Sequence, residues 1–514
     1  MRHLPVPASD GDGRRICSFE QRGDKRVKLH PVLIAAAGAL ATATPALAQT
    51  PATCPAEPVR LDFAHAGGNR FDVTVEAQGA SGVLDILWRP GEGAQDGTAD
   101  FIEDLRFSDD PRPATYQGYG TWQHPGGEAA GWDGYSYTLV ADHDRAVWEV
   151  GKEETAYRFD DAFYFTGNPV LVLNHAWTDC TFDIAFDLPE DWQVVAAWPQ
   201  TGPGRYRVEG LNDVVRNIFV TGPGLAPQTF DIDGMAVTLL AQQPLADGVA
   251  DFRRVLEDSL ARYAQTFGGV PMERYLVVFG EGQMNDGGAF AQSFGQRMPA
   301  PFRPHERLMW ARTLAHETLH AWLGVTIRPV PYAQSQWFTE GGADYFAMKT
   351  LYRAGLVDEH DVIFMLEGQI RRFLLGRIAS GPVSLAEAGE DKQANRQLVY
   401  GGGALFHYLL DARMTEQSGP GAYEVALESL YQSADRDYSQ ARLLAALDAR
   451  SDGAASEILA LLDGPFDPFG LLDTLDDTGL ATAAFGPDEI LVRFAAGDCA
   501  GSRENACMPA FLRR

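Results

Sequence analysis

The sequence predicts a multidomain fold, in which an all-β N-terminal part precedes an α+β, mostly helical part. Residues 49–240 consist of short apolar or alternating segments separated by turn residues, a pattern typical of β-sandwiches and barrels. From residue 304 onward, apolar residues recur at helical spacing, which predicts amphipathic helices. The chain has 514 residues, enough for about three domains. We therefore expect a β-rich domain over 49–240 and a second domain over 241–480.

The composition excludes several classes of function. The chain carries 42 Lys+Arg against 70 Asp+Glu, a formal net charge of −28, and 45% hydrophobic residues. This composition is globular rather than disordered. Nucleic acid is not an expected partner, because a surface that binds it needs clustered Lys and Arg. The composition leaves the oligomeric state open.

The first 48 residues have the pattern of an export signal with a long leading segment. A basic stretch over 25–28 precedes an apolar run from Val32 to Ala48, which ends in Ala-Leu-Ala; this order is typical of a cleavable secretory signal. The run contains Pro45 and is shorter than the roughly 20 residues that a membrane span needs. We expect an exported chain, periplasmic or secreted, with no stable membrane anchor after cleavage.

Four cysteines follow residue 48 and predict two disulfides. They are Cys54, Cys180, Cys499 and Cys507, and an even number in an exported chain is typical of disulfide pairing. Three pairings are possible. We favour Cys499 with Cys507, because a short loop closes at low entropic cost, and this leaves Cys54 with Cys180. Four free thiols are the alternative. Residues 481–514 are expected to form an irregular tail that holds the second disulfide.

Individual elements can be placed along both parts. The clearest strands of the β-rich domain are Tyr135 to Val140 and Phe182 to Phe186. Residues 249–267 show helical spacing and stop at Gly268-Gly269, a helix-ending pair. A strand is expected from Tyr275 to Phe279, and a helix over 304–323 opens with a proline, a favourable first-turn residue.

The helix expected over 304–323 carries the motif His316-Glu317-Thr318-Leu319-His320. Residues four apart on a helix lie on one face, so the two imidazoles can bind one metal ion while Glu317 reaches a water molecule beside it. Chance would produce H-E-x-x-H about once in a hundred such chains, so the motif needs support from other residues.

Glu340 is the candidate third ligand, because a catalytic zinc needs three protein ligands and one open position. It lies 20 residues after His320, at the expected start of a helix that runs to about Ala354 with Thr339 as its cap. Asp344 follows one turn later and is expected to orient a ligand histidine. The alternative for Glu340 is a helix-start carboxylate favoured by the helix dipole. A His-His-Glu set favours one Zn²⁺ over manganese or cobalt.

The wider sequence resembles the glycyl aminopeptidase family of gluzincin metallopeptidases. The motif H-E-x-x-H, followed about twenty residues later by W-F-x-E-G, is similar to the metal site of that family. Further similar segments are Ala156 to Asp161, Gly167 to Pro169, Leu188 to Trp192, Pro382 to Leu385 and Val399 to Leu405. The resemblance covers roughly residues 60–475 and implies a β-rich N-terminal domain and a thermolysin-like zinc peptidase domain. The family often ends in a PDZ domain, which we do not expect here.

The resemblance implies a role for each residue of the site. The implied ligands of one Zn²⁺ are His316, His320 and Glu340, and the implied general base is Glu317. Tyr400 matches a tyrosine that, in related aminopeptidases, opens a helix, and it would donate a hydrogen bond to the developing oxyanion.

Tyr400 also has a structural alternative, as a half-buried aromatic residue at a helix start. Tyr332 and Tyr345 are weaker candidates for the same oxyanion donor.

The stretch 286–293 departs from the family. Relatives commonly carry G-G-L-E-H there, and the Glu of that motif can hold the free amine of a substrate. If Gly287 and Gly288 align with those glycines, Phe290 stands where the Glu would be. A peptide substrate is still expected to pair with the backbone at these glycines as an added strand. The alternative is a plain hairpin turn.

The resulting hypothesis is an exported zinc metallopeptidase that hydrolyses peptides through a metal-activated water and is aminopeptidase-like. One alternative is a zinc endopeptidase that lacks amine recognition. The other is a non-catalytic envelope protein that binds peptides, against which stands Glu317, because a binder needs no general base. The preferred substrate side chains stay open.

Overall fold

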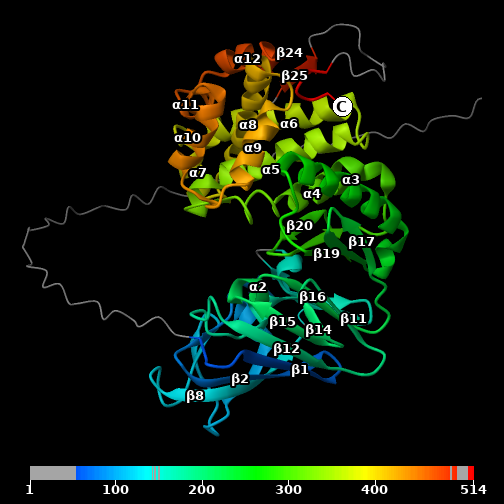
Figure 1. Ribbon diagram of the computed structural model, residues 1–514, viewed down its shortest axis with the longest axis vertical. Coiled ribbons are helices and arrows are strands. Elements are labelled where there is room, and N and C mark those ends of the chain that lie inside the picture. Colours follow the sequence, from blue (N-terminus) through cyan, green and yellow to red (C-terminus); the bar gives the residue numbers. More distant parts are fainter. Residues whose placement is uncertain are drawn as a thin grey trace, which may run out of the picture. The chain divides into compact units, whose positions relative to one another are not determined.

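The computed structural model describes residues 54–141, 143, 146–148, 151–486, 489–494 and 508–513. The predicted export signal and the predicted Cys499–Cys507 disulfide lie outside the described residues. Figure 1 shows strands through the blue and cyan parts of the chain and helices through most of its yellow and orange parts. The predicted order, a β-rich part followed by a mostly helical part, is confirmed. Among the described residues, no helix is both long and apolar enough to cross a membrane.

Two main sheets build the β-rich part. The larger sheet has the strand order β14 (Gln200–Gly202), β15 (Arg205–Glu209), β12 (Thr181–Asp187), β1 (Val59–Gly67), β2 (Arg70–Ser81), β8 (Gly131–Val140) and β5 (Ile102–Phe107). The smaller sheet has the order β10 (Ala156–Phe159), β11 (Ala162–Thr166), β16 (Ile218–Gly222) and β13 (Gln193–Ala196). The predicted strands Tyr135 to Val140 and Phe182 to Phe186 are confirmed as parts of β8 and β12.

Short elements connect these strands. Two small sheets comprise β3 (Leu84–Asp85), β6 (Thr115–Gly118) and β7 (Thr121–Gln123), and β4 (Gly91–Glu92) with β9 (Val147–Trp148). The short helices are η1 (Gly97–Phe101), η2 (Lys152–Glu154), α1 (Gly167–Val170) and α2 (Leu211–Val215).

The four-stranded sheet lies between two hydrophobic cores. Phe163 and Phe165 of β11 belong to the core shared with the seven-stranded sheet. Tyr164, between them, belongs to a second core that includes Leu240 and Leu276 of the next sheet. Successive side chains of a strand point to opposite faces, so a strand is buried at every position only when both faces are covered. This explains why β11 is buried throughout.

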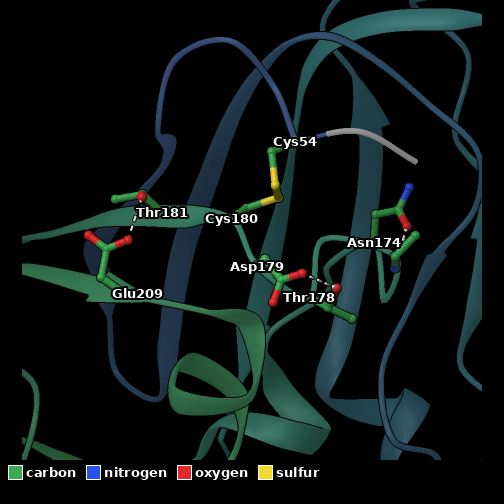
Figure 2. The surroundings of a disulfide bond; sticks show 8 residues. Cys54, Asn174, Thr178, Asp179, Cys180, Thr181 and Glu209 are labelled. Carbon is green, nitrogen blue, oxygen red and sulfur yellow. Dashed lines mark hydrogen bonds between the residues drawn. A yellow bond between two sulfur atoms is a disulfide. The ribbon is translucent and has the colours of Figure 1, made fainter. Parts of the chain in front are cut away.

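A disulfide ties the start of the described chain to the β-rich part. Cys54 is bonded to Cys180, with the two Cα atoms 5.3 Å apart, and Figure 2 shows this bond close to the Thr181–Glu209 hydrogen bond between β12 and β15. The structure therefore agrees with the pairing that the sequence leaves for these two cysteines.

The boundary between the β-rich part and the mostly helical part lies before residue 240. A five-stranded sheet has the order β17 (Gln228–Ile232), β18 (Met235–Ala241), β19 (Arg274–Glu281), β21 (Ser293–Met298) and β20 (Asp286–Ala289). Because β18 pairs in parallel with β19, β17 and β18 belong to the same sheet as β19, β21 and β20. The predicted strand Tyr275 to Phe279 is confirmed within β19.

The second part is mostly helical. Its helices are η3 (Gln243–Gly248), α3 (Val249–Phe267), η4 (Pro304–Glu306), α4 (Arg307–Leu319), α5 (Tyr332–Arg353), α6 (Glu359–Ser380), α7 (Leu385–Glu390), α8 (Arg396–Ser418), α9 (Ala422–Tyr431), α10 (Gln440–Ser451), α11 (Ala454–Asp463) and α12 (Pro468–Asp476). The predicted helix over 249–267 and its end at Gly268 are confirmed, and Gly268 has the left-handed conformation that favours glycine there. A two-stranded sheet joins β22 (Arg328–Pro329) to β23 (Asp437–Tyr438).

Two predicted helix boundaries are wrong. The helix expected over 304–323 is α4, which ends at Leu319, with His320 as its C-cap. The helix expected to start beside Glu340 is α5, which starts eight residues earlier at Tyr332 after Pro331. Thr339 is therefore not a cap, and the helix-start explanation for Glu340 no longer applies.

Glycines bring α5 and α8 into direct contact. A Cβ atom added at Gly341 would overlap the backbone of Gly403, and one added at Gly403 would overlap the backbone of Trp337. Glycine at these positions lets the two helix backbones touch. This contact explains Gly341 and Gly403, whereas Gly401 packs against the backbone of α6 and Gly402 against Leu385. It brings the part of α5 that carries Glu340 close to the part of α8 that carries Tyr400.

The end of the described chain is not the irregular tail that the sequence predicts. β24 (Leu480–Gly486) and β25 (Glu489–Phe494) form an antiparallel hairpin. Phe511 and Leu512, further along, are buried in the core of the helical part. A short segment in which apolar and polar residues alternate can form a hairpin when a helical core covers its apolar face.

Candidate metal centre

His316 and His320 extend from the end of α4, with ring centroids 5.0 Å apart and ring planes at 84°. His316 lies in the last turn of α4, and His320 follows as the C-cap with helical backbone angles. The spacing of four residues therefore still places both rings on one face. Both residues are buried, with exposed fractions of 6% and 9%.

One carboxylate oxygen of Glu340, on α5, lies close to both imidazole rings. Its Oε2 lies 3.4 Å from Nε2 of His316 and 3.6 Å from Nε2 of His320. The structure thus brings the three predicted ligands together. Glu317 also has an oxygen in this group, because potential ligand atoms of His316, Glu317 and His320 lie within 4.8 Å of one another. Its Oε1 is 4.0 Å from His316 Nε2, so Glu340 is better placed as the third ligand.

The hydrogen bonds of the histidines indicate that a cation fits between these atoms. Nδ1 of His316 lies 2.9 Å from Oδ1 of Asp344, and Nδ1 of His320 lies 3.1 Å from the carbonyl oxygen of Leu323. A neutral imidazole that donates through Nδ1 has a lone pair on Nε2. Two lone pairs and a carboxylate oxygen then face one another, which is an arrangement of acceptors that a divalent ion satisfies. The residues present therefore fit a zinc ion.

Without a metal ion, a proton is the alternative cation. Burial lowers the pKa of His316, but hydrogen bonds to Asp344 and Glu340 outweigh it and raise this pKa to about 10. Binding of a metal requires the neutral imidazole, so the ion would have to displace this proton.

Asp344 is the centre of a buried polar network. Its Oδ1 accepts from Arg312 at 2.9 Å as well as from His316, and its Oδ2 accepts from Gln369 at 2.8 Å and Arg372 at 3.0 Å. Burial would raise the pKa of Asp344, but these cations hold it below its usual value. Asp344 is thus an ionised acceptor in the position that the sequence predicts for it, and it fixes the His316 ring.

Replacing Asp344 tests this positioning role. In Asp344→Asn, one oxygen becomes an amide donor, which cannot accept from His316, Arg312, Gln369 and Arg372 together. We expect zinc affinity to fall about 10–100-fold, measured by competition with a chelator of known affinity. Glu416→Gln, an exposed change on α8, is the control. Zinc affinity equal to that of the control would contradict the role.

Glu317 lies beside the ligands but bonds to neither ring. A Cβ atom added at Gly287 of β20 would lie 3.3 Å from Cγ of Glu317, so the edge strand packs directly against this side chain. Burial raises the pKa of Glu317, while His316 and His320 oppose that shift. A carboxylate in this environment binds protons more readily than an exposed one, as a general base near neutral pH requires.

Tyr400 lies at the centre beside His316. Its ring stacks on His316, with centroids 6.0 Å apart and an interplanar angle of 14°. Burial, then the charge of Glu340, raises the pKa of Tyr400, so its hydroxyl stays protonated and able to donate. Tyr345, an alternative from the sequence, donates to Asp411 in the core at 2.5 Å and is excluded. Tyr332, the other alternative, begins α5 and is 49% exposed, but burial and then the charge of Glu340 raise its pKa, so the structure does not exclude it.

Gly287 and Gly288 lie on a strand, not in a turn. β20 pairs antiparallel with β21 and forms the edge of the five-stranded sheet. The hairpin-turn alternative is therefore wrong for these two residues. Phe290, two residues after Gly288, is buried in the core between the four-stranded and five-stranded sheets.

Sequence reasoning missed the charged residues around this centre. Arg312 lies one helical turn before His316, and that spacing could have predicted that Arg312 lies on the same helix face. Arg372 and Gln369 come from α6, and no local pattern links them to Asp344. Lys392 precedes α8, and its Nζ donates to Oε1 of Glu340 at 2.7 Å.

Comparisons with known proteins agree with this geometry. Residues 309–400, which include the two histidines, Glu340 and Tyr400, match the model of the M61 glycyl aminopeptidase family. No curated protein sequence matches the chain. The family match confirms the resemblance to gluzincin peptidases over this segment.

Solved structures share the fold. A crystal structure of an aminopeptidase N family protein from Idiomarina loihiensis is 17% identical, with a TM-score of 0.69, over 83% of this chain and 79% of that one. A crystal structure of an M1 zinc metallopeptidase from Deinococcus radiodurans is 15% identical, with a TM-score of 0.51, over 81% of this chain and 97% of that one. The family match and this fold support the assignment of the chain as a peptidase, a hydrolase.

Proposed function

We propose that this chain, a peptidase by its family match, is an exported zinc metallopeptidase with a thermolysin-like catalytic part and aminopeptidase-like action. The observation that carries the proposal is the convergence of Nε2 of His316, Nε2 of His320 and Oε2 of Glu340, with Glu317 beside them. One Zn²⁺ is the proposed cofactor, because two imidazoles and one carboxylate with an open fourth position are a catalytic zinc set.

Zinc, when bound by these three residues, would polarise the peptide carbonyl and make an adjacent water molecule more acidic. Glu317 accepts the proton of the attacking water and passes it to the leaving amine. Tyr400 donates its hydroxyl hydrogen to the oxygen on which negative charge develops. Asp344 keeps the His316 ring in one tautomer and orientation throughout.

The edge strand β20 is the proposed binding site for the peptide backbone. Its free edge offers main-chain groups to an extended substrate, which would add to the sheet as a further strand. Gly287 packs against Glu317, so a substrate that pairs here passes directly beside the proposed base. The absence of side chains at Gly287 and Gly288 allows this close approach.

Glu153, a buried acidic residue next to β20, is a candidate for recognition of a free amine. Glu153 of η2 is 3% exposed, and its Cγ lies 3.3 Å from the position of a Cβ added at Gly288. Burial, then the charge of Asp286, raises the pKa of Glu153 to about 8. A neighbouring ammonium group would reverse this effect and be held by the ionised carboxylate.

An endopeptidase is the second candidate, because Phe290 is buried and, if Gly287 and Gly288 align with the glycines of the family motif, stands in place of the amine-holding Glu. A peptide library with free and with acetylated N-termini separates the two. We expect cleavage of the free peptides at the N-terminal bond and little cleavage of the acetylated ones. Internal cleavage at similar rates in both sets would establish the endopeptidase instead. Elemental analysis of the same purified chain should find about one zinc per molecule.

The chain is proposed to act outside the cytoplasm. The apolar run before Ala48 and the Cys54–Cys180 disulfide support this location, because disulfides persist in oxidising compartments.

A further inference from the structure

Lys392 contacts the proposed zinc ligand Glu340 from the side that faces away from the histidines. Its Nζ lies 2.7 Å from Oε1 of Glu340, whereas Oε2 of the same carboxylate faces the two rings. The Lys392 side chain is 22% exposed and that of Glu340 is 6% exposed. The two oxygens therefore have separate partners, and the ion pair is largely shielded from water.

A lysine is an unusual cation for this chain. Only five of its 42 Lys+Arg residues are lysines, and three follow residue 28, namely Lys152, Lys349 and Lys392. The other buried carboxylate of the centre, Asp344, is held by two arginines, one on each oxygen. The cation next to Glu340 thus differs from the two next to Asp344, although the buried Asp411 is also paired with a lysine, Lys349.

The two cations act differently on a carboxylate. The planar guanidinium of arginine can bind both carboxylate oxygens at once, although the two arginines at Asp344 take one oxygen each. The ammonium of lysine is a point charge that can take a single oxygen. An arginine at 392 would compete for Oε2, which the metal needs. A neutral residue would leave Oε1 without a partner and free to turn towards the ion.

We propose that Lys392 is a positioning residue that restricts Glu340 to one-oxygen binding of zinc; this inference rests on the proposed zinc site. With Oε1 held, only Oε2 is offered to the ion, and the position required by the attacking water stays open. The ammonium also withdraws charge from the carboxylate, so that Glu340 neutralises the ion less and a stronger Lewis acid remains.

The neighbouring arginines do not duplicate this role. The guanidinium carbon of Arg372 lies 4.6 Å from the Tyr400 ring centroid, and this residue is paired with Asp344. That of Arg396 lies 5.0 Å from the same centroid. Among the described residues, Lys392 is the one Lys or Arg for which the structure records an ion pair with Glu340.

The test compares three variants of the full exported chain, loaded with zinc. Lys392→Met removes the charge and keeps the length, Lys392→Arg keeps the charge and changes the geometry, and Arg254→Met removes an exposed cation of α3 as a control. Crystal structures of the zinc forms show how many oxygens of Glu340 bind, and chelator competition gives the zinc dissociation constant.

We expect Glu340 to bind through one oxygen in the wild type and the control and through two in Lys392→Met. That variant should hold zinc at least as tightly as the wild type, yet its kcat should fall about 10–100-fold, and the acid limb of its pH–rate profile should move to higher pH. Lys392→Arg should bind zinc at least tenfold more weakly.

One-oxygen binding in Lys392→Met would overturn the inference, as would wild-type zinc affinity in Lys392→Arg. A wild-type chain that binds no zinc would instead reject the proposed function, so the two failures can be told apart.

Discussion

Glu317→Gln should abolish peptide hydrolysis and leave the zinc content unchanged. An amide of nearly the same size fills the space beside Gly287, so the local packing is kept. It cannot accept a proton from the attacking water, and loss of a general base typically lowers kcat about 10²–10⁴-fold. Steady-state kinetics with a cleaved library peptide, together with elemental analysis of the same preparation, measure both quantities.

Glu273→Gln is the matched control, because this carboxylate is 93% exposed and lies before β19, away from the ligands. It should behave as the wild type. A Glu317→Gln variant that keeps kcat within tenfold of the control would reject Glu317 as the base. A variant that loses zinc would show instead that Glu317 is a ligand.

His320→Ala should remove zinc from the chain, and activity with it. Two ligands would remain, and a catalytic zinc site needs three from the protein. We expect zinc affinity to fall at least about a hundredfold, measured by chelator competition. Bound zinc should raise the Tm of the wild type, because a ligand that binds only the folded state stabilises it. The same zinc concentration should leave the Tm of His320→Ala unchanged.

His305→Ala is the control for this loss, since His305 is exposed on η4, close to the same helix. Its zinc content should match that of the wild type. One equivalent of tightly bound zinc in His320→Ala would contradict the assignment of this ring as a ligand. Replacing Glu340 with Gln should give the same loss as His320→Ala, because it removes the third donor.

Local periodicity explains which parts of the centre the sequence predicts. His316 and His320 meet because residues four apart share a helix face, and this rule holds although His320 lies just past the end of α4. Asp344 follows Glu340 by the same interval, so a position beside a ligand ring could be predicted for it. The helix 249–267 was predictable for the same reason, together with the glycine at its end.

Contacts between distant elements explain what the sequence does not predict. α5 starts at Tyr332 rather than beside Glu340, and Gln334 and Gln336 in its first turns hydrogen-bond to α7. Tyr345 is a weaker candidate than Tyr400 from the sequence, and the structure excludes it because its side chain donates to Asp411 in the core. The partners Arg372 and Lys392 come from α6 and the α7–α8 connection. Such pairings depend on tertiary packing, and contacts between distant segments leave no regular spacing of residues in the sequence.

The direct contact between α5 and α8 has a consequence for how this centre tolerates change. Gly341 follows Glu340 at once, and Gly403 lies less than one turn after Tyr400. Direct backbone contact thus sets the distance between the main chains that carry Glu340, a proposed metal ligand, and Tyr400, the proposed oxyanion donor. Protein interiors compress little. We therefore expect a single methyl group added where α5 and α8 cross to increase the distance between Glu340 and Tyr400 without unfolding either helix.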